Sequence, residues 1–258
     1  MLLNVHEWGD PEAPTVVCLH GVTGHGERFR KLAEERWTKR FHIVAPDLRG
    51  HGRSGWEPPW TFETNVADIL ETLDARGIGE ADWVGHSWGG RLVLELAAKH
   101  PERIRRAVLL DPAIQVLPDV ALHAAELELT DATFASADEY VERRGDGPAT
   151  PRDLVLADAE LHCDVLPDGR LRRRASQAAI VSVFGELASR PPAPETLRAP
   201  TLLIYAPAYG LVRDEQLEAY DGRVETLAVP GMHMVIWDAF DEVADAVEGF
   251  LENPRAHR

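Results

Sequence analysis

The chain has 258 residues, 45% of them hydrophobic, so it can bury the core of one good-sized domain. Its formal net charge of −16 comes from 27 basic and 43 acidic residues, which disfavours binding to nucleic acid or anionic membranes and favours a small-molecule partner. The two cysteines, Cys18 and Cys163, are expected to be free thiols, which favours a reducing, cytoplasmic location.

Strand-like and helix-like segments alternate through the first half of the chain. Continuous apolar runs are expected for strands that are covered on both faces, and apolar residues at helical spacing indicate the intervening helices. Such repeated units indicate a mostly parallel sheet with helices on both sides. The predicted elements are strands at 2–8, 15–19, 41–45, 83–84 and 106–110, and helices at 27–39, 61–77 and 91–98.

One short turn joins a strand to a helix with the sequence Gly85-His86-Ser87-Trp88-Gly89. A serine on such a tight turn has its hydroxyl pushed out of the sheet, above the N-terminus of the following helix. Glycines flank it because a Cβ would collide with neighbouring backbone. We therefore predict that Ser87 is a nucleophile.

The pattern changes after residue 112. No buried strand is predicted between residues 113 and 198, and turns are predicted at 145–148 and 167–169. We predict a core formed by residues 1–112 and 199–258, interrupted by a helical insertion at 113–198. The remaining predicted elements are helices at 120–129, 137–144, 152–159, 176–188 and 238–251, and strands at 201–205 and 224–229.

Four segments together resemble the α/β-hydrolase fold superfamily, and the resemblance covers nearly the whole chain. In chain order they are His20-Gly21-Val22-Thr23, the run at 46–54, the turn at 85–89, and Pro230-Gly231-Met232-His233. The resemblance implies a serine hydrolase with a helical cap at 113–198. It also implies His233 as general base, the backbone N–H groups of Val22 and Trp88 as oxyanion hole, and no metal or organic cofactor.

The carboxylate that would orient His233 is not where many members of that superfamily carry it. The stretch after the strand at 201–205 contains no acid, and Tyr209 stands about where one is expected. Asp111 ends the strand that follows the Ser87 helix, a place that some members use for the acid. Asp214 is the alternative, although it precedes a helical pattern and is also a reasonable N-cap. We favour Asp111 and keep Asp214 open.

Other residues allow weaker interpretations. His25 could line the mouth of a pocket together with Tyr209, and the histidines around these motifs lack metal-binding spacing. The arginines between Arg170 and Arg174 favour a solvated or salt-bridging surface over a carboxylate-binding patch.

The function expected from these motifs is hydrolysis of a small ester-like substrate through an acyl-enzyme intermediate. One alternative uses the same three side chains to cleave an amide, a lactone or a carbon–carbon bond, or for lyase chemistry. A second alternative is a non-catalytic small-molecule receptor on a hydrolase scaffold. Fold does not determine the reaction, so the sequence leaves the substrate and the oligomeric state open.

Overall fold

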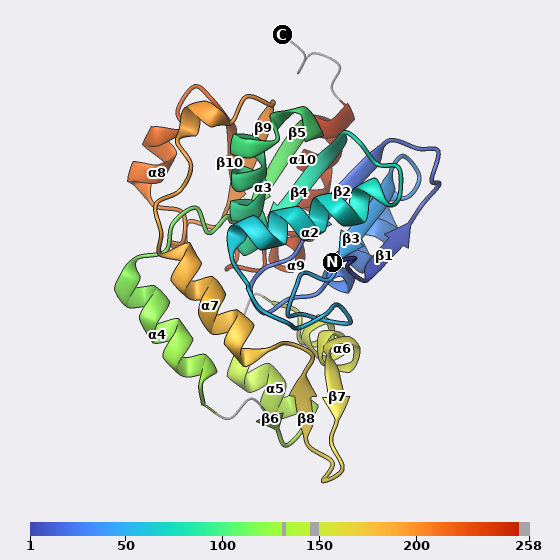
Figure 1. Cartoon of the computed structure of the whole chain (residues 1–258), viewed down its shortest axis with the longest axis vertical. Coiled ribbons are helices and arrows are strands. Elements are labelled where there is room, and N and C mark those ends of the chain that lie inside the picture. Colours follow the sequence, from blue (N-terminus) through green and yellow to red (C-terminus); the bar gives the residue numbers. More distant parts are fainter. Residues whose placement is uncertain (131–132, 145–149, 253–258) are drawn as a thin grey trace.

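The computed structural model describes residues 1–130, 133–144 and 150–252, and its main feature is a seven-stranded sheet (Figure 1). The strand order is β1-β3-β2-β4-β5-β9-β10; β1 pairs antiparallel with β3 and the other pairs are parallel. The predicted mostly parallel sheet is therefore confirmed. The strands are β1 (Val5–Trp8), β2 (Thr15–Leu19), β3 (His42–Pro46), β4 (Ala81–His86), β5 (Ile104–Leu110), β9 (Thr201–Tyr205) and β10 (Glu225–Ala228).

Helices cover both faces of this sheet, and an apolar core lies on each face. Successive strand residues point to opposite faces, so Val17 and Leu19 enter one core whereas Val16 and Cys18 enter the other. Helices α2 and α3 cover the first face, and α10 covers the second (Figure 1). The helices of the core are α2 (Phe62–Asp74), α3 (Trp88–Lys99), α8 (Asp214–Ala219), α9 (Val235–Asp238) and α10 (Phe240–Glu252).

The helix predicted over residues 27–39 is not one continuous helix. A 3₁₀ turn at Gly26–Phe29 leads into the short helix α1 (Arg30–Leu32) and then a π-helical turn at Ala33–Trp37. These changes of pitch keep Phe29 and Trp37 buried in the second core, a tertiary requirement that local periodicity does not express.

The described residues of the segment inserted between β5 and β9 form four α-helices and, contrary to the sequence-based expectation, a small antiparallel sheet in the order β6-β8-β7. Gly169 adopts φ +84° in the tight turn between β7 and β8, as its turn motif predicts. Strands this short have too few residues for an alternating pattern to be recognised. The predicted turn at 145–148 lies outside the described residues. The elements are α4 (Pro118–Glu128), β6 (Thr133–Phe134), α5 (Ala137–Arg144), α6 (Arg152–His162), β7 (Cys163–Val165), β8 (Leu171–Arg173) and α7 (Gln177–Leu187).

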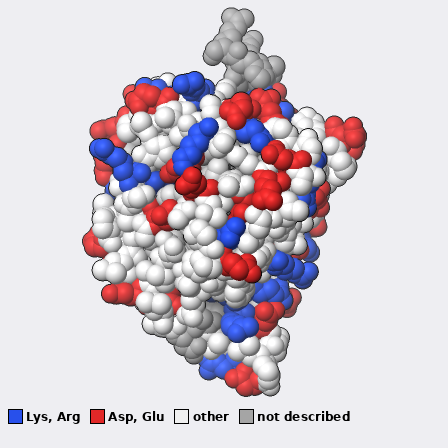
Figure 2. All heavy atoms as spheres, in the orientation of Figure 1, with Lys and Arg blue, Asp and Glu red and all other residues white. Residues whose placement is uncertain are grey.

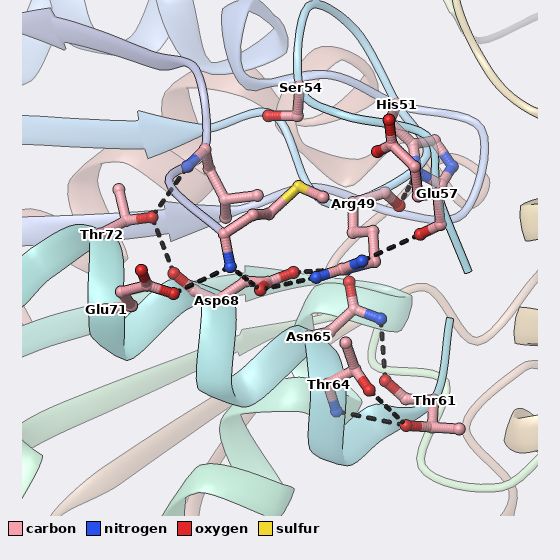
Figure 3. A network of polar contacts seen from close by, with 12 residues as sticks. Arg49, His51, Ser54, Glu57, Thr61, Thr64, Asn65, Asp68, Glu71 and Thr72 are labelled. Atoms are coloured by element: carbon pink, nitrogen blue, oxygen red, sulfur yellow. Dashed lines mark hydrogen bonds and ion pairs between the residues drawn. The ribbon is translucent and has the colours of Figure 1, made fainter. Parts of the chain in front are cut away.

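This inserted segment, called the cap below, lies beyond one end of the sheet (Figure 1). The loop after β3 connects it to the core, because Gly52 N–H donates to Arg174 O (2.7 Å) and Ser176 N–H donates to Gly50 O (2.8 Å). The same loop is fixed to α2 by Arg49, which makes two hydrogen bonds to Asp68 at 2.6 and 2.9 Å (Figure 3). The loop is therefore a rigid link between the core and the cap.

Acidic and basic side chains are interspersed on the face shown in Figure 2, so the negative net charge does not form a continuous patch there. Within residues 1–130, 133–144 and 150–252, no helix has both the length and the apolar character needed to cross a membrane.

Candidate active site

Ser87 occupies the turn between β4 and α3 with φ +55° and ψ −115°, a conformation that non-glycine residues rarely adopt. Its N–H donates to Leu110 O (2.9 Å) and its carbonyl accepts from Ala113 N–H (3.0 Å), so the end of β5 holds the turn on both sides. A Cβ on Gly89 would lie 2.1 Å from Leu19 O, which leaves no room for a side chain. The small residue at position 89 therefore leaves room for this turn, and the hydrogen bonds to Leu110 and Ala113 stabilise it.

His233 lies in the loop between β10 and α9, and its imidazole faces Asp111. The Nδ1–H of His233 donates to Oδ2 of Asp111 at 2.6 Å, and Asp111 is fully buried at the end of β5. With its hydrogen on Nδ1, the neutral ring keeps a lone pair on Nε2, which is the form required of a general base. The second oxygen of Asp111 accepts from Ala206 N–H at 3.2 Å. Asp214 is exposed at the first position of α8, so the structure brings Asp111 to the imidazole.

Two further side chains hold His233 in place. His86 Nε2–H donates to the His233 carbonyl oxygen at 2.9 Å. Tyr209 stacks on the imidazole with a centroid separation of 4.7 Å and an interplanar angle of 16°. Tyr209, which stands where an acid was expected after β9, thus contacts the histidine through its ring.

The loop after β2 lies directly against the nucleophile. A Cβ on Gly21 would lie 3.1 Å from Cβ and 3.5 Å from Oγ of Ser87, so only glycine allows this close approach without displacement. Val22 follows it and lines the cavity above Ser87. Trp88 is the first residue of α3, where the backbone N–H has no acceptor within the helix. Two predicted donors, the N–H groups of Val22 and Trp88, therefore flank Ser87.

Ser87 and His233 open into one cavity of about 490 Å³ between the core and the cap. Most of its cap wall is apolar, and Tyr209 contributes to the side near His233. Arginine side chains line part of it as well. The cap residues that line this cavity are Ala113, Val116, Val120, Ala124, Leu127, Glu128, Thr130, Phe134, Arg143, Arg173, Phe184 and Leu187.

Two of the weaker sequence-based interpretations need correction or refinement. His25 is buried and donates from Nε2 to Oδ1 of Asp158 at 2.8 Å, so it connects core and cap instead of lining the mouth of the pocket. The arginines of 170–174 mostly bind within the cap: Arg173 pairs with Glu128 (2.6 Å) and Arg174 with Asp164 (2.7 Å). Within this cluster it is Arg173 that reaches the cavity wall.

A buried polar group around Asp158 was missed by sequence reasoning. Asp158 on α6 accepts two hydrogen bonds from Arg28 at 2.9 and 3.0 Å and one from the Tyr140 hydroxyl at 2.7 Å. These residues lie up to 130 positions apart and form no motif, so the sequence contains no signal for the group. Among the described residues, no cluster of three or more His, Cys, Asp or Glu side chains could hold a metal ion.

Comparison with known proteins agrees with this fold. A family profile described as the alpha/beta hydrolase fold matches residues 14–237. The chain belongs to the α/β-hydrolase family. It is 37% identical to the lipase LipV of Mycobacterium tuberculosis over 96% of this chain and 97% of that protein. It is also 32% identical to the 2-(acetamidomethylene)succinate hydrolase of Mesorhizobium japonicum, over 97% and 91% of the two chains.

A solved structure has the same fold over nearly the whole chain. The crystal structure of E-2-(acetamidomethylene)succinate hydrolase superposes with a TM-score of 0.87 at 27% identity, covering 97% of this chain and 95% of that one. The names of these relatives support a hydrolase.

Proposed function

We propose that this α/β-hydrolase is a serine hydrolase that cleaves a small ester-like substrate through an acyl-enzyme intermediate. The observation that carries the proposal is the 2.6 Å contact between His233 Nδ1 and Asp111 Oδ2, beside a serine in the strained conformation of a nucleophile turn. A base oriented by a buried carboxylate next to a serine is the arrangement that acyl transfer requires.

The reaction has two halves with the same chemistry. Ser87 Oγ loses its proton to His233 Nε2 and attacks the ester carbonyl carbon, giving a tetrahedral intermediate. His233 returns the proton to the leaving alkoxide as the carbon–oxygen bond breaks, leaving the acyl group on Ser87. A water molecule then gives its proton to His233 and attacks, and the acid departs as Ser87 recovers its proton. Asp111 stabilises the imidazolium in both halves.

Charge that develops on the carbonyl oxygen needs fixed donors. We assign this role to the N–H groups of Val22 and Trp88, because the first belongs to the loop packed against Ser87 and the second begins α3. The positive end of the α3 dipole adds to the effect.

The cavity supports a small substrate with an apolar acyl portion. A volume of about 490 Å³ accommodates a small organic molecule. The apolar side chains of α4 and α7 face it, which suits a hydrocarbon chain better than a polar group. The name lipase of one relative is consistent with an ester bond.

The receptor alternative loses its main support. It drew weight from the absence of an acid after the strand at 201–205, and Asp111 provides a carboxylate from β5 instead. We also propose a cytoplasmic location, which suits the free, buried thiols of Cys18 and Cys163.

Active-site labelling tests the proposal directly. A fluorophosphonate probe should label the wild-type protein at Ser87, and labelling should be lost in Ser87→Ala and His233→Ala variants that remain folded by circular dichroism. A folded wild-type protein that takes up no probe would contradict a serine hydrolase and revive the receptor alternative.

A substrate panel then identifies the bond. We expect turnover of p-nitrophenyl esters of short and medium chain length, compared with lactones, amides and dione substrates under the same conditions. Labelling at Ser87 with turnover only of amides, lactones or diones would retain the mechanism and overturn the ester assignment.

A further inference from the structure

Three successive carbonyl groups of the loop after β2 are each bound by a buried side chain. His20 Nδ1–H donates to Gly21 O at 2.8 Å, and Arg28 Nη2–H donates to Thr23 O at 3.0 Å. Between them, His51 Nε2–H donates to Val22 O. The loop is therefore held by a donor on each of its three peptide groups.

This arrangement determines where the Val22 N–H points. A trans peptide is planar, so its N–H and its C=O point in opposite directions. The Gly21 carbonyl and the Val22 N–H belong to one peptide. The hydrogen bonds that His51 and Arg28 donate to Val22 O and Thr23 O fix the backbone angles of Val22 and Thr23. The donor assigned above to the oxyanion hole is thus oriented by side chains on the other side of the loop.

The histidines of this set are held by the core. His20 Nε2 accepts from Leu48 N–H at 2.9 Å, and His51 lies in the loop that Arg49 fixes to α2 (Figure 3). Burial lowers the pKa of His51 to about 4 and holds the pKa of His20 well below its usual range. Both rings are therefore neutral near pH 7, and a neutral His51 ring donates to only one of the two carbonyl oxygens beside it, Val22 O and Arg49 O; we assign its hydrogen to Nε2, which faces Val22 O.

Arg28 differs because its partner comes from the cap. Its guanidinium makes a two-pronged pair with Asp158 of α6, with Nε to Oδ1 at 2.9 Å and Nη2 to Oδ2 at 3.0 Å. Arg28 is 5% exposed and Asp158 is 3% exposed. A buried pair of this kind is rigid, since either charge alone would be strongly destabilised. The position of the arginine nitrogen that reaches Thr23 thus depends on α6.

We propose that Asp158 is a positioning residue of the cap, which acts through Arg28 on the Thr23 carbonyl and so orients the Val22 N–H for catalysis. The inference rests on the serine hydrolase function proposed above. The cap then supports the oxyanion hole from a distance, in addition to its role as a wall of the cavity. His25 and Tyr140 also donate hydrogen bonds to Asp158.

Three variants test this chain of contacts. Asp158→Asn removes the charge that holds Arg28. Arg28→Lys keeps an ion pair, but its single ammonium group cannot reproduce the planar, two-pronged contact with Asp158 that fixes the direction of the donor to Thr23 O. We expect each to lower kcat roughly tenfold to a hundredfold with little change in KM. Tyr140→Phe is the matched control: it removes one hydrogen bond to the same carboxylate, leaves the Arg28 pair intact, and should keep kcat within about twofold of wild type.

The measurements must separate positioning from folding. Rates are referred to folded protein, as quantified by circular dichroism, and affinity is measured for a trifluoromethyl ketone, whose adduct with Ser87 carries an oxyanion. Ketone affinity should fall in parallel with kcat, whereas the pH profile should keep its shape because His233 and Asp111 are untouched. Arg28→Lys retains both charges, so it decides the question if Asp158→Asn does not fold.

The outcomes distinguish this inference from the proposed function. A wild-type protein without labelling or turnover would overturn the serine hydrolase itself. An active wild type with unchanged kcat and ketone affinity in Arg28→Lys or in folded Asp158→Asn would overturn the positioning role alone. A rise in KM confined to anionic esters, with kcat unchanged, would assign Arg28 to substrate binding and would also overturn it.

Discussion

The carboxylate of Asp111 lies 2.6 Å from His233 Nδ1, although 122 positions separate the two residues along the chain. The end of β9 fixes the aspartate on both its backbone and its side chain: Asp111 N–H donates to Ile204 O (2.7 Å), and Ala206 N–H donates to Oδ1 (3.2 Å). Asp111 adopts φ +39°, which aspartate tolerates better than most residues. Asp111, at the end of β5, is therefore a fixed and fully buried acceptor for His233, which lies in a loop.

Replacing Asp111 by asparagine should lower kcat by about 10⁴-fold, because the amide favours the wrong tautomer of His233. Asparagine also tolerates the positive φ, so the fold should be retained. Steady-state hydrolysis of p-nitrophenyl acetate measures the effect. Asp214→Asn is the control and should retain wild-type turnover, since Asp214 is exposed on α8. Full activity of Asp111→Asn with an inactive Asp214→Asn would reverse the assignment.

Local features of the site could be predicted from sequence because they depend on neighbouring residues. The turn at Ser87 is contained in five residues, and the strand before it and the helix after it are recognised by period. Asp111 could be favoured because it ends the strand that follows the Ser87 helix, a place that some members of the superfamily resembled by the sequence use for the acid. The pairing of His233 with Asp111 over Asp214 needed the structure.

Features that depend on tertiary contact were missed. Arg28 and Asp158 are ordinary charged residues in their local sequence, and their pairing across core and cap arises only from the packing of α6. The β6-β8-β7 sheet was missed because two or three residues cannot establish an alternating pattern. Periodicity reports which face of an element is buried, and it does not report which distant partner covers that face.

Stability should fall in acid partly through His51. Burial lowers the pKa of His51 to about 4, so below about pH 6.5 the unfolded chain binds a proton that the folded chain does not. The protein therefore has its full stability above about pH 6.5 as far as His51 is concerned. The free energy of unfolding then decreases progressively as the pH falls toward 4. Between pH 7 and pH 4.5 this single group should remove about 2–3 kcal/mol of the free energy of unfolding.

Urea unfolding at the two pH values measures this loss. His51→Gln removes the titrating group, so the difference in unfolding free energy between pH 7 and pH 4.5 should be smaller in the variant than in the wild type. His20 and His162, whose pKa values burial also lowers, remain in both proteins. An equal loss in the two proteins would show that His51 is not responsible.

Two glycine-to-alanine substitutions should have opposite effects on stability. A Cβ on Gly89 would lie 2.1 Å from the Leu19 carbonyl oxygen, so Gly89→Ala should force β2 and α3 apart and destabilise the protein by several kcal/mol. Gly185 lies in α7, and a Cβ at this position would meet no atom of another element within 4 Å, so Gly185→Ala should stabilise by about 0.5–1 kcal/mol. Thermal unfolding compares both variants with the wild type, and a stable, active Gly89→Ala would contradict the packing at the Ser87 turn.

The ring of Tyr209 should contribute to the placement of His233. It stacks on the imidazole at 4.7 Å and is 46% exposed, so its loss should affect the histidine more than the fold. Aromatic pairs contribute about 0.5–1.5 kcal/mol, so Tyr209→Ala should lower kcat roughly twofold to tenfold if stacking favours the productive orientation. Tyr209→Phe keeps the ring, so its kcat should stay near the wild-type value.

Acetyl esters are the appropriate substrates, because Tyr209 also lines the cavity and a long chain would add binding effects. Equal loss of kcat in the two variants would assign the effect to the hydroxyl group, and unchanged kcat in Tyr209→Ala would remove Tyr209 from the positioning of the base.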